Sequence, residues 1–318
     1  MRIGRILAAA TATACTALCL TTAQPAASAA PAPQAAGLSA AVQPAPGGDY
    51  TAHVPGGDTA APDSVAAAAL PAFDHIVVVI EENHSFTQVI GNANAPYITS
   101  LANGGANMTQ SFAVTHPSEP NYLALFSGST QGLTDDSCPH TYTANNLGRQ
   151  LITAGRTFVG YSESMPSDGY TGCTSGRYAR KHNPWVNFTN VPASSNLRFT
   201  RFPTDFTQLP TVSVVVPNLC NDMHDCSVRT GDTWVKNNLG AYATWAKTHN
   251  SLLLVTFDED DHSAGNRIGT LFYGAHVATG TYAERITHYS VLRTLENLYG
   301  LPCVANSCSA TGITDIWN

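Results

Sequence analysis

Residues 75–86 read HIVVVIEENHSF. The apolar run after His75 is typical of a strand that is buried on both faces of a parallel sheet. Two adjacent glutamates, Glu81 and Glu82, follow it with no turn residue between, although only 12% of the chain is charged. Carboxylates at the end of a buried strand are costly unless a partner or a bound ion stabilises their charge, and other segments of the chain offer such partners.

The chain after this stretch alternates continuous apolar strands with amphipathic segments. This pattern predicts an α/β fold, with a largely parallel central sheet and helices on both faces. Ligands of such sheets bind beyond the carboxyl ends of the strands. The expected strands after 75–80 are 157–161, 212–216, 252–257 and 268–273, and the expected helices are 95–103, 121–127, 145–154, 231–248 and 290–299.

The N-terminus predicts export. Arg2 and Arg5 precede an apolar run, and an A-x-A cleavage site ends at Ala29, so we expect residues 1–29 to be a secretory signal peptide cleaved near Ala29. Residues 30–70 are rich in Ala and Pro and are expected to be a disordered linker or propeptide. The ordered domain is expected over residues 71–318, and the mature chain is expected to be soluble, secreted and monomeric.

Charge and cysteine content agree with a secreted enzyme. The net charge of −7 gives no basic surface for nucleic acid. An even set of cysteines in an exported chain predicts disulfides. Zinc is the alternative, but the chain has no CxxC pair. Short loops favour Cys220–Cys226 and Cys303–Cys308, which leaves Cys138 with Cys173.

Three expected strands end in polar side chains. Like charges gathered there would repel and raise each other's pKa unless a cation lay among them. Carboxylate, amide and imidazole groups suit a hard or borderline divalent metal. Any one of these polar clusters could equally well be a helix cap or a solvated turn. The metal site is predicted because three such clusters are expected at the same edge of the sheet. The residues are Glu82, Asn83 and His84 after the first strand, Asn218, Asp222, His224 and Asp225 after 212–216, and Asp258, Glu259, Asp260, Asp261 and His262 after 252–257.

A serine offers a nucleophile. In THPSEPNYLALFSG, residues 115–128, Ser118 stands at the start of an apolar helix, where free backbone N–H groups attract phosphate. A metal can help to deprotonate such a serine. Ser118 as a simple N-cap is the structural alternative, and Thr115 is a rival nucleophile. A Ser-His-Asp hydrolase would need a G-x-S-x-G elbow, which Ser118 lacks.

These motifs carry a family resemblance. The runs IVVVIEENHSF, PSEPNYLALFSG, NDMHD, TFDEDD and ITHYSVLRTLENLYGLP, in this order, resemble the bacterial phosphoesterase family over about residues 73–302. That family includes secreted acid phosphatases and phospholipases C, and belongs to the alkaline phosphatase superfamily. The chain is most similar to the small secreted acid phosphatases. The resemblance implies an alkaline phosphatase-like phosphoesterase domain over residues 71–318.

The resemblance also implies roles for residues. Ser118 lies two residues before a Pro-Asn pair, which favours it over Thr115 as the nucleophile. The proposed metal site of this chain has more oxygen ligands and fewer imidazoles than the sites of two-zinc enzymes, so calcium, magnesium and zinc are all candidates. If Glu82 faces the metal, then Glu81 faces away, toward water or a supporting partner. The implied metal ligands are Glu82, Asn83, Ser118, Asp258, Glu259 and Asp222, and the implied second-metal candidates also include His224 and His288.

We therefore expect a secreted, metal-dependent phosphomonoesterase, an acid phosphatase that hydrolyses phosphoinositides or other phosphate monoesters through a phosphoserine. His224, His288 or a metal-bound water would serve the leaving group. Asn121 and His116 are candidate substrate contacts, with a helix-surface amide and an ordinary loop histidine as the alternatives.

A basic run completes the candidates. Arg177, Arg180, Lys181 and His182 form it, and such runs are generally solvated surface. The alternative is a clamp for an anionic group, such as a lipid head group at a membrane surface.

Two other functions fit the same motifs. One is a phosphodiesterase of the phospholipase C type. The other is a secreted binding protein without catalytic activity, because a fold does not fix a function.

Overall fold

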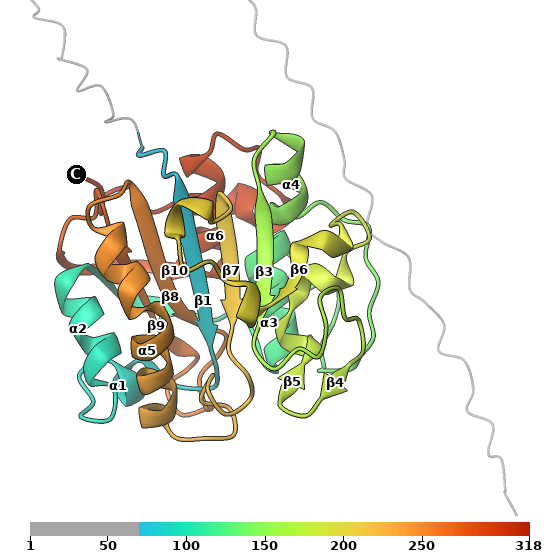
Figure 1. Cartoon of the computed structure of the whole chain (residues 1–318). Coiled ribbons are helices and arrows are strands. Elements are labelled where there is room, and N and C mark those ends of the chain that lie inside the picture. The colour runs from blue at the N-terminus through green and yellow to red at the C-terminus, as the bar shows by residue number, and fades with distance from the viewer. Residues whose placement is uncertain (1–69) are drawn as a thin grey trace, which may run out of the picture. The chain divides into compact units, whose positions relative to one another are not determined.

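A computed structural model describes residues 70–318 (Figure 1). The expected signal peptide, residues 1–29, lies outside the described residues, as does the expected linker, residues 30–70, apart from its last residue. Within the described part, none of the helices combines the length and the apolar character that a membrane crossing needs.

The central sheet confirms the α/β fold. Its strand order is β10-β2-β9-β8-β1-β7-β3-β6, and every neighbouring pair is parallel except the two that involve β9. The strands are β1 (His75–Glu81), β2 (Ala106–Phe112), β3 (Phe158–Ser162), β6 (Asn196–Arg198), β7 (Val212–Val216), β8 (Ser251–Phe257), β9 (Arg267–Gly274) and β10 (Gly280–Thr287). A separate hairpin pairs β4 (Thr174–Ser175) with β5 (Tyr178–Ala179).

β9 runs antiparallel to β8 because the connection between the two strands is short. Only residues 258–266 connect β8 to β9, whereas a parallel crossover needs about a dozen residues or more. The sequence pattern did not predict β2 and β10. The exposure of side chains in β10 alternates along the strand, as is typical of a strand at the edge of a sheet.

Helices cover both faces of the sheet. Alternate residues of β1 divide between two cores: Val77 and Val79 pack with α2 and α5, whereas Val78 and Ile80 pack with α3, α4 and α6. Figure 1 shows α2 and α5 on one side of the sheet and α3 and α6 on the other. The helices are α1 (Phe86–Val89), α2 (Pro96–Gly104), α3 (Ser118–Ser127), α4 (Leu147–Thr153), α5 (Val228–Ala246) and α6 (His288–Leu298).

Short 3-10 helices occur mainly in the connection between β5 and β7. One of them, η1, carries residues that reach the candidate site. They are η1 (Arg180–His182), η2 (Pro184–Asn187), η3 (Ala193–Ser195), η4 (Phe199–Arg201), η5 (Phe206–Gln208) and η6 (Ala305–Ser309).

Three disulfides join the described cysteines. Cys220 pairs with Cys226, Cys303 pairs with Cys308, and Cys138 pairs with Cys173. These are the pairs that the loop lengths favoured. Cys138–Cys173 ties the connection after α3 to the β4–β5 hairpin, so it fixes two segments that border the candidate site.

Candidate active site

The ends of three adjacent strands build the floor of the site. β1 lies between β7 and β8, and all three run parallel, so their carboxyl ends meet at one edge of the sheet. Backbone hydrogen bonds continue this pairing beyond the strands. Glu82 N–H donates to the Asp222 carbonyl at 2.8 Å, and Asp258 N–H donates to the Glu81 carbonyl at 3.0 Å.

Asn83 turns the chain away from β1 directly after Glu82. Its φ of 54° lies in the left-handed region, which Asn tolerates better than most residues. The turn brings the Asn83 backbone N–H to 3.0 Å from Asp258 Oδ1, and the Asn83 side chain donates to Glu82 Oε2 at 3.0 Å. The EEN segment is therefore bonded to the segment after β8.

Ser118 lies among these carboxylates. It is the first residue of α3, it is 2% exposed, and Pro117 precedes it as the N-cap residue. The Ser118 hydroxyl is 3.0 Å from Glu82 Oε2 and 3.4 Å from Glu259 Oε1. The N-cap alternative for Ser118 is therefore wrong. The Thr115 hydroxyl instead donates to the His116 carbonyl at 3.1 Å.

Four buried carboxylates gather at this edge of the sheet, and Ser118 contacts two of them, Glu82 and Glu259. Burial and then the charge of Asp258 raise the pKa of Glu82 well above its ordinary value. Burial also raises the pKa of Asp222 to about 7, that of Asp258 to about 6 and that of Glu259 to about 8. A cluster that resists ionisation in this way is a site where a bound cation would be strongly favoured.

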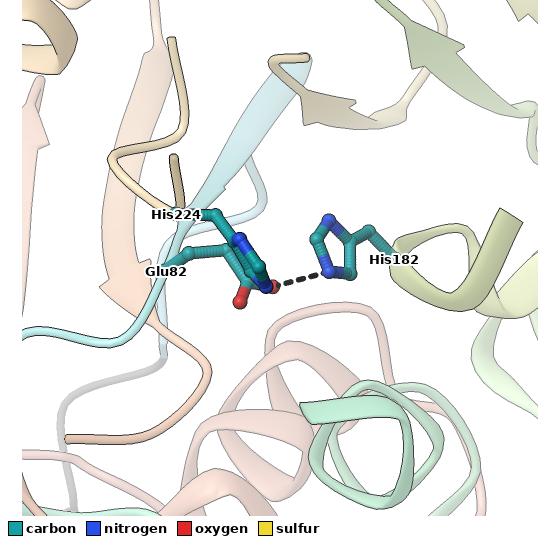
Figure 2. A group of neighbouring side chains, drawn as sticks. All are labelled: Glu82, His182 and His224. Atoms are coloured by element: carbon teal, nitrogen blue, oxygen red, sulfur yellow. Dashed lines mark ion pairs between the residues drawn. The ribbon is translucent and has the colours of Figure 1, made fainter. Parts of the chain in front are cut away.

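The donor atoms fit a metal ion. Asp258 Oδ2 is buried and has no hydrogen-bond partner among the described residues, and Asp222 Oδ2 is buried with His182 Nδ1 3.3 Å away but outside hydrogen-bond geometry. Glu82, His182 and His224 each offer one ligand atom, and these atoms all lie within 4.8 Å of one another. Figure 2 shows His182 facing Glu82 from η1, with His224 beside them. Carboxylates with two imidazoles suit a divalent metal, but they do not identify it.

His182 is the site residue that the sequence pattern placed wrongly. Its ring is buried, with Nε2 3.0 Å from Glu82 Oε1 and Nδ1 3.3 Å from Asp222 Oδ2. It also stacks on Tyr122, whose hydroxyl donates to Glu82 Oε1. Burial lowers the pKa of His182 well below its ordinary value, which favours the neutral ring. The apolar Pro184 and Trp185 that follow show only that the chain turns inward nearby; the contacts that bury the ring come from distant segments.

The expectation of a solvated basic surface is wrong for Arg180 as well. Its guanidinium is buried and donates to Asn187 Oδ1 at 3.0 Å and to the carbonyls of Thr171 and His140 at 2.6 and 2.8 Å. Arg180 therefore holds loops together. Arg177 is exposed, as expected for its part of the run.

Lys181 stands at the border of the site. Its Nζ is 2.8 Å from Asp136 Oδ2, and Asp136 Oδ1 accepts the backbone N–H of Glu119 at 2.9 Å. Burial lowers the pKa of Lys181, but the hydrogen bond to Asp136 and the charge of Glu82 outweigh it, so the pKa is raised. The positive charge of Lys181 in turn lowers the pKa of Glu82 and of Glu259.

Asn121 and His116 border Glu259. Asn121 is fully buried, so its alternative as a helix-surface amide is wrong. Its Oδ1 accepts the N–H groups of residues 114 and 115, and its Nδ2 lies 3.2 Å from Glu259 Oε2. His116 is 25% exposed, with Nδ1 2.9 Å from Glu259 Oε2 and Nε2 3.3 Å from Asp260 Oδ1.

The two histidine candidates for the leaving group differ in environment. His288 is buried at the start of α6, and its Nε2 donates to the Asp258 carbonyl at 2.7 Å. Burial lowers its pKa to about 4. His224 is exposed, its Nδ1 is 2.8 Å from Asp225 Oδ1, and its backbone N–H donates to Asp222 Oδ1 at 2.8 Å.

Glu81 faces away from Ser118, as the alternation along β1 predicts. The supporting partner that was expected for it is not found among the described residues. The side chain is fully buried, and both carboxylate oxygens are without a hydrogen-bond partner among the described residues. Burial and then the charge of Asp222 raise its pKa well above the ordinary value.

A family model completes this picture. The model of the phosphoesterase family matches residues 92–302. The chain belongs to the phosphoesterase family. The match includes Ser118, His182, Asp222 and Asp258, and it confirms the resemblance. Membership confirms the enzyme class as well, a hydrolase of phosphate esters.

Individual relatives agree with this family. The chain is 57% identical to a phosphatidylinositol-3-phosphatase of Mycobacterium tuberculosis, over 80% of this chain and 86% of that protein. It is 32% identical to a phosphate-repressible acid phosphatase of Penicillium chrysogenum, over 78% of this chain and 67% of that protein.

Solved structures share the fold. A lipoteichoic acid synthase of Listeria monocytogenes matches with a TM-score of 0.56 at 11% identity, over 79% of this chain and 78% of that one. An alkaline phosphatase superfamily protein of Vibrio parahaemolyticus matches with a TM-score of 0.51 at 15% identity, over 73% of this chain and 68% of that one. The expected alkaline phosphatase-like fold is therefore confirmed.

Proposed function

We propose that this phosphoesterase is a metal-dependent phosphomonoesterase that works through a phosphoserine on Ser118. The observation that carries the proposal is the position of the Ser118 hydroxyl, at the N-terminus of α3 and 3.0 Å from Glu82. Backbone N–H groups at a helix start favour negative charge, both on the serine oxygen and on a phosphoryl group. The identity with a phosphatidylinositol-3-phosphatase supports phosphoinositides as one substrate class.

The metal would be held by residues from the three strand ends. Glu82, Asn83, Asp258 and Glu259, with Ser118, form one set of proposed ligands around the serine oxygen. Asp222 and His182 border the same carboxylate and are further candidates, whereas the exposed His224 is left to serve the leaving group. When bound, the metal would lower the pKa of the serine hydroxyl and offset the charge of the phosphoryl oxygens.

The first step forms a bond from Ser118 Oγ to phosphorus and breaks the bond from phosphorus to the ester oxygen. Glu82 Oε2 is the nearest acceptor toward which the hydroxyl hydrogen points. The departing oxygen needs a proton. His224 is the better donor because its ring is exposed, whereas the His288 ring is buried and its Nε2 already donates to the Asp258 carbonyl. Water then hydrolyses the phosphoserine and releases phosphate.

Lys181 is the cation that can reach an incoming phosphate. It lies beside the carboxylates that surround Ser118, and its partner Asp136 also bonds the start of α3. This arrangement supports the anion clamp that the basic run suggested. Asn121 and His116 would act by orienting Glu259, which both of them contact.

Substrate assays test the proposal. Purified protein would be assayed with p-nitrophenyl phosphate, a phosphoinositide monoester, a phosphodiester and phosphatidylcholine, with calcium, magnesium or zinc added separately. We expect phosphate release from the monoesters alone. Release of diacylglycerol from phosphatidylcholine would favour the phospholipase C alternative. We also propose that the protein is exported, which the three disulfides support.

A further inference from the structure

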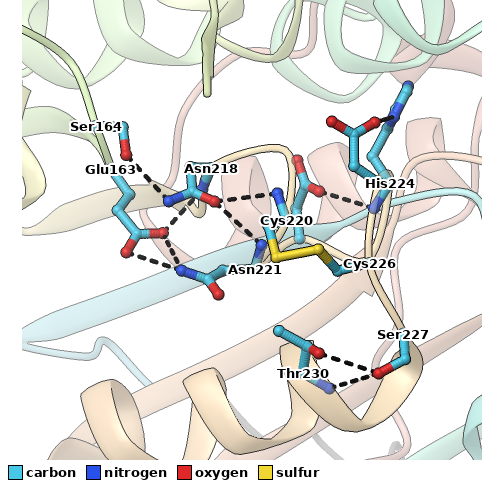
Figure 3. Close-up of a disulfide and its surroundings, with 11 residues drawn as sticks. Glu163, Ser164, Asn218, Cys220, Asn221, His224, Cys226, Ser227 and Thr230 are labelled. Atoms are coloured by element: carbon cyan, nitrogen blue, oxygen red, sulfur yellow. Dashed lines mark hydrogen bonds and ion pairs between the residues drawn. A yellow bond between two sulfur atoms is a disulfide. The ribbon is translucent and has the colours of Figure 1, made fainter. Parts of the chain in front are cut away.

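Glu163 directly follows β3, in the segment SESMPSDG, which has no role in the proposed reaction. Its carboxylate accepts hydrogen bonds from three different residues. Asn218 N–H lies 2.9 Å from Oε2, and Asn221 Nδ2 lies 3.0 and 2.9 Å from the two oxygens. Trp234 Nε1 of α5 lies 3.0 Å from Oε1. Figure 3 shows Glu163 meeting the two asparagines.

The bonded partners belong to the loop that follows β7. Asn218 Oδ1 accepts the N–H groups of Cys220 at 3.0 Å and of Asn221 at 3.2 Å. The Cys220–Cys226 disulfide closes the same loop (Figure 3). The loop is thus rigid within itself, and Glu163 attaches it to the sheet and to α5.

The loop carries two residues of the candidate site. The Asp222 carbonyl accepts Glu82 N–H at 2.8 Å, and Asp222 Oδ1 accepts His224 N–H at 2.8 Å. Movement of the loop would shift the His224 ring away from Glu82.

We propose that Glu163 is a positioning residue that holds the loop 218–226 so that His224 can protonate the leaving group. This inference rests on the proposed function. Glu163 touches neither Ser118 nor its carboxylate neighbours through any hydrogen bond found in residues 70–318. Its effect therefore passes through the loop.

E163Q keeps the size of the side chain but replaces one acceptor oxygen with an NH2 group. In either orientation of the amide, that group meets N–H donors, so the loop loses part of its attachment. A displaced His224 matters most for a leaving group that needs a proton. The glycerol of glycerol phosphate would leave as a strongly basic alkoxide unless it is protonated, whereas p-nitrophenolate leaves readily without protonation.

The test compares kcat/KM for glycerol phosphate and p-nitrophenyl phosphate in three variants, because both substrates give the same phosphoserine and kcat/KM reports the step in which the leaving group departs. H224A should lose about 100-fold or more on glycerol phosphate and far less on p-nitrophenyl phosphate. E163Q should show the same preference, with about 10-fold greater loss on glycerol phosphate. D168N is the matched control, because Asp168 lies in the same segment but pairs with Arg198 and Arg201; it should leave the ratio unchanged.

Partial unfolding would lower both rates by the same factor, so the ratio separates positioning from stability. Thermal unfolding and a free-thiol assay would check that E163Q is folded with Cys220–Cys226 intact. Should E163Q fail to fold, N221A serves in its place, since it removes a donor that contacts both oxygens of Glu163. An equal loss on the two substrates overturns the inference, as does an H224A variant without any preference between them. Wild-type protein that hydrolyses neither substrate overturns the proposed function instead.

Discussion

Ser118 donates its hydroxyl hydrogen to Glu82 across 3.0 Å, which joins the first residue of α3 to the residue directly after β1. The two residues are 36 positions apart in the chain, and they meet because α3 starts over the carboxyl edge of the sheet. This contact places the one buried hydroxyl of the segment 115–118 against an acidic cluster rather than against solvent.

S118A should reduce hydrolysis of p-nitrophenyl phosphate by about 1,000-fold or more, because the variant has no oxygen to form the covalent intermediate. T115A is the matched control and should keep most of the activity, since the Thr115 hydroxyl donates to a neighbouring carbonyl and the substitution leaves its backbone hydrogen bonds in place. Initial rates under saturating substrate measure both. The nucleophile would be Thr115 if the two results were reversed.

Removal of metal should abolish activity and lower thermal stability, because the buried carboxylates then repel one another. Restoring an ion at about 100 times its Kd adds about 2.7 kcal/mol to the free energy of unfolding. Scanning calorimetry after exhaustive chelation, with calcium, magnesium or zinc returned, measures the shift.

Two neighbouring variants sharpen the metal test. E82Q should lose most of the metal-induced rise in Tm, whereas E81Q should keep it, because Glu81 faces away from Ser118. Full activity in exhaustive chelator would refute the metal requirement.

The metal-free protein should become less stable as pH rises from about 4 to 8. The pKa values of Asp258, Asp222 and Glu259 are raised to about 6, 7 and 8, above the value of about 4 in the unfolded chain. At these carboxyls the folded state binds more protons than the unfolded state, so they make the free energy of unfolding fall with pH; buried His182 and His288, whose pKa values are lowered, act in the opposite sense below about 6.5, which makes the fall steepest above that pH. Tm measured at pH 5 and pH 8 in chelator checks the sign. Saturating metal should weaken this dependence, and a Tm that increases with pH in chelator would contradict it.

K181M should raise KM for phosphate monoesters by roughly 10-fold while changing kcat less, because the ammonium group is proposed to bind phosphate rather than to transfer a proton. R177M is the control, since Arg177 is an exposed member of the same basic run. Steady-state kinetics on p-nitrophenyl phosphate separate KM from kcat. An equal KM for K181M and the wild type would remove Lys181 from the proposed anion clamp.

Much of the fold followed from apolar strands whose pattern is local. β1, β7 and β8 are continuous apolar runs, so both their existence and their parallel packing could be predicted. The meeting of Glu82, Asp222 and Asp258 then followed from the rule that parallel strands end at one edge. β2 and β10 could not be found in this way, because polar residues interrupt both patterns and β10 is also exposed at the edge of the sheet.

His182 could not be placed from local pattern because its position depends on distant segments. The connection that carries it has short 3-10 helices instead of periodic elements, and its burial comes from Tyr122 and from two acids of other strands. The burial of Arg180 could not be predicted from local sequence either. A basic side chain in a loop is usually solvated, and only the folded carbonyls around it make burial possible.

Adjacent glutamates at the end of β1 have a further consequence. Glu81 and Glu82 belong to opposite faces, and β1 is paired on both sides along its length, so the strand cannot shift by one position without moving its whole apolar set between the two cores. The packing of valines deep in the sheet thus decides which of two chemically identical side chains meets Ser118. A single-residue insertion or deletion within 76–80 would exchange the faces of the two glutamates, so that Glu81 rather than Glu82 would lie on the side of Ser118.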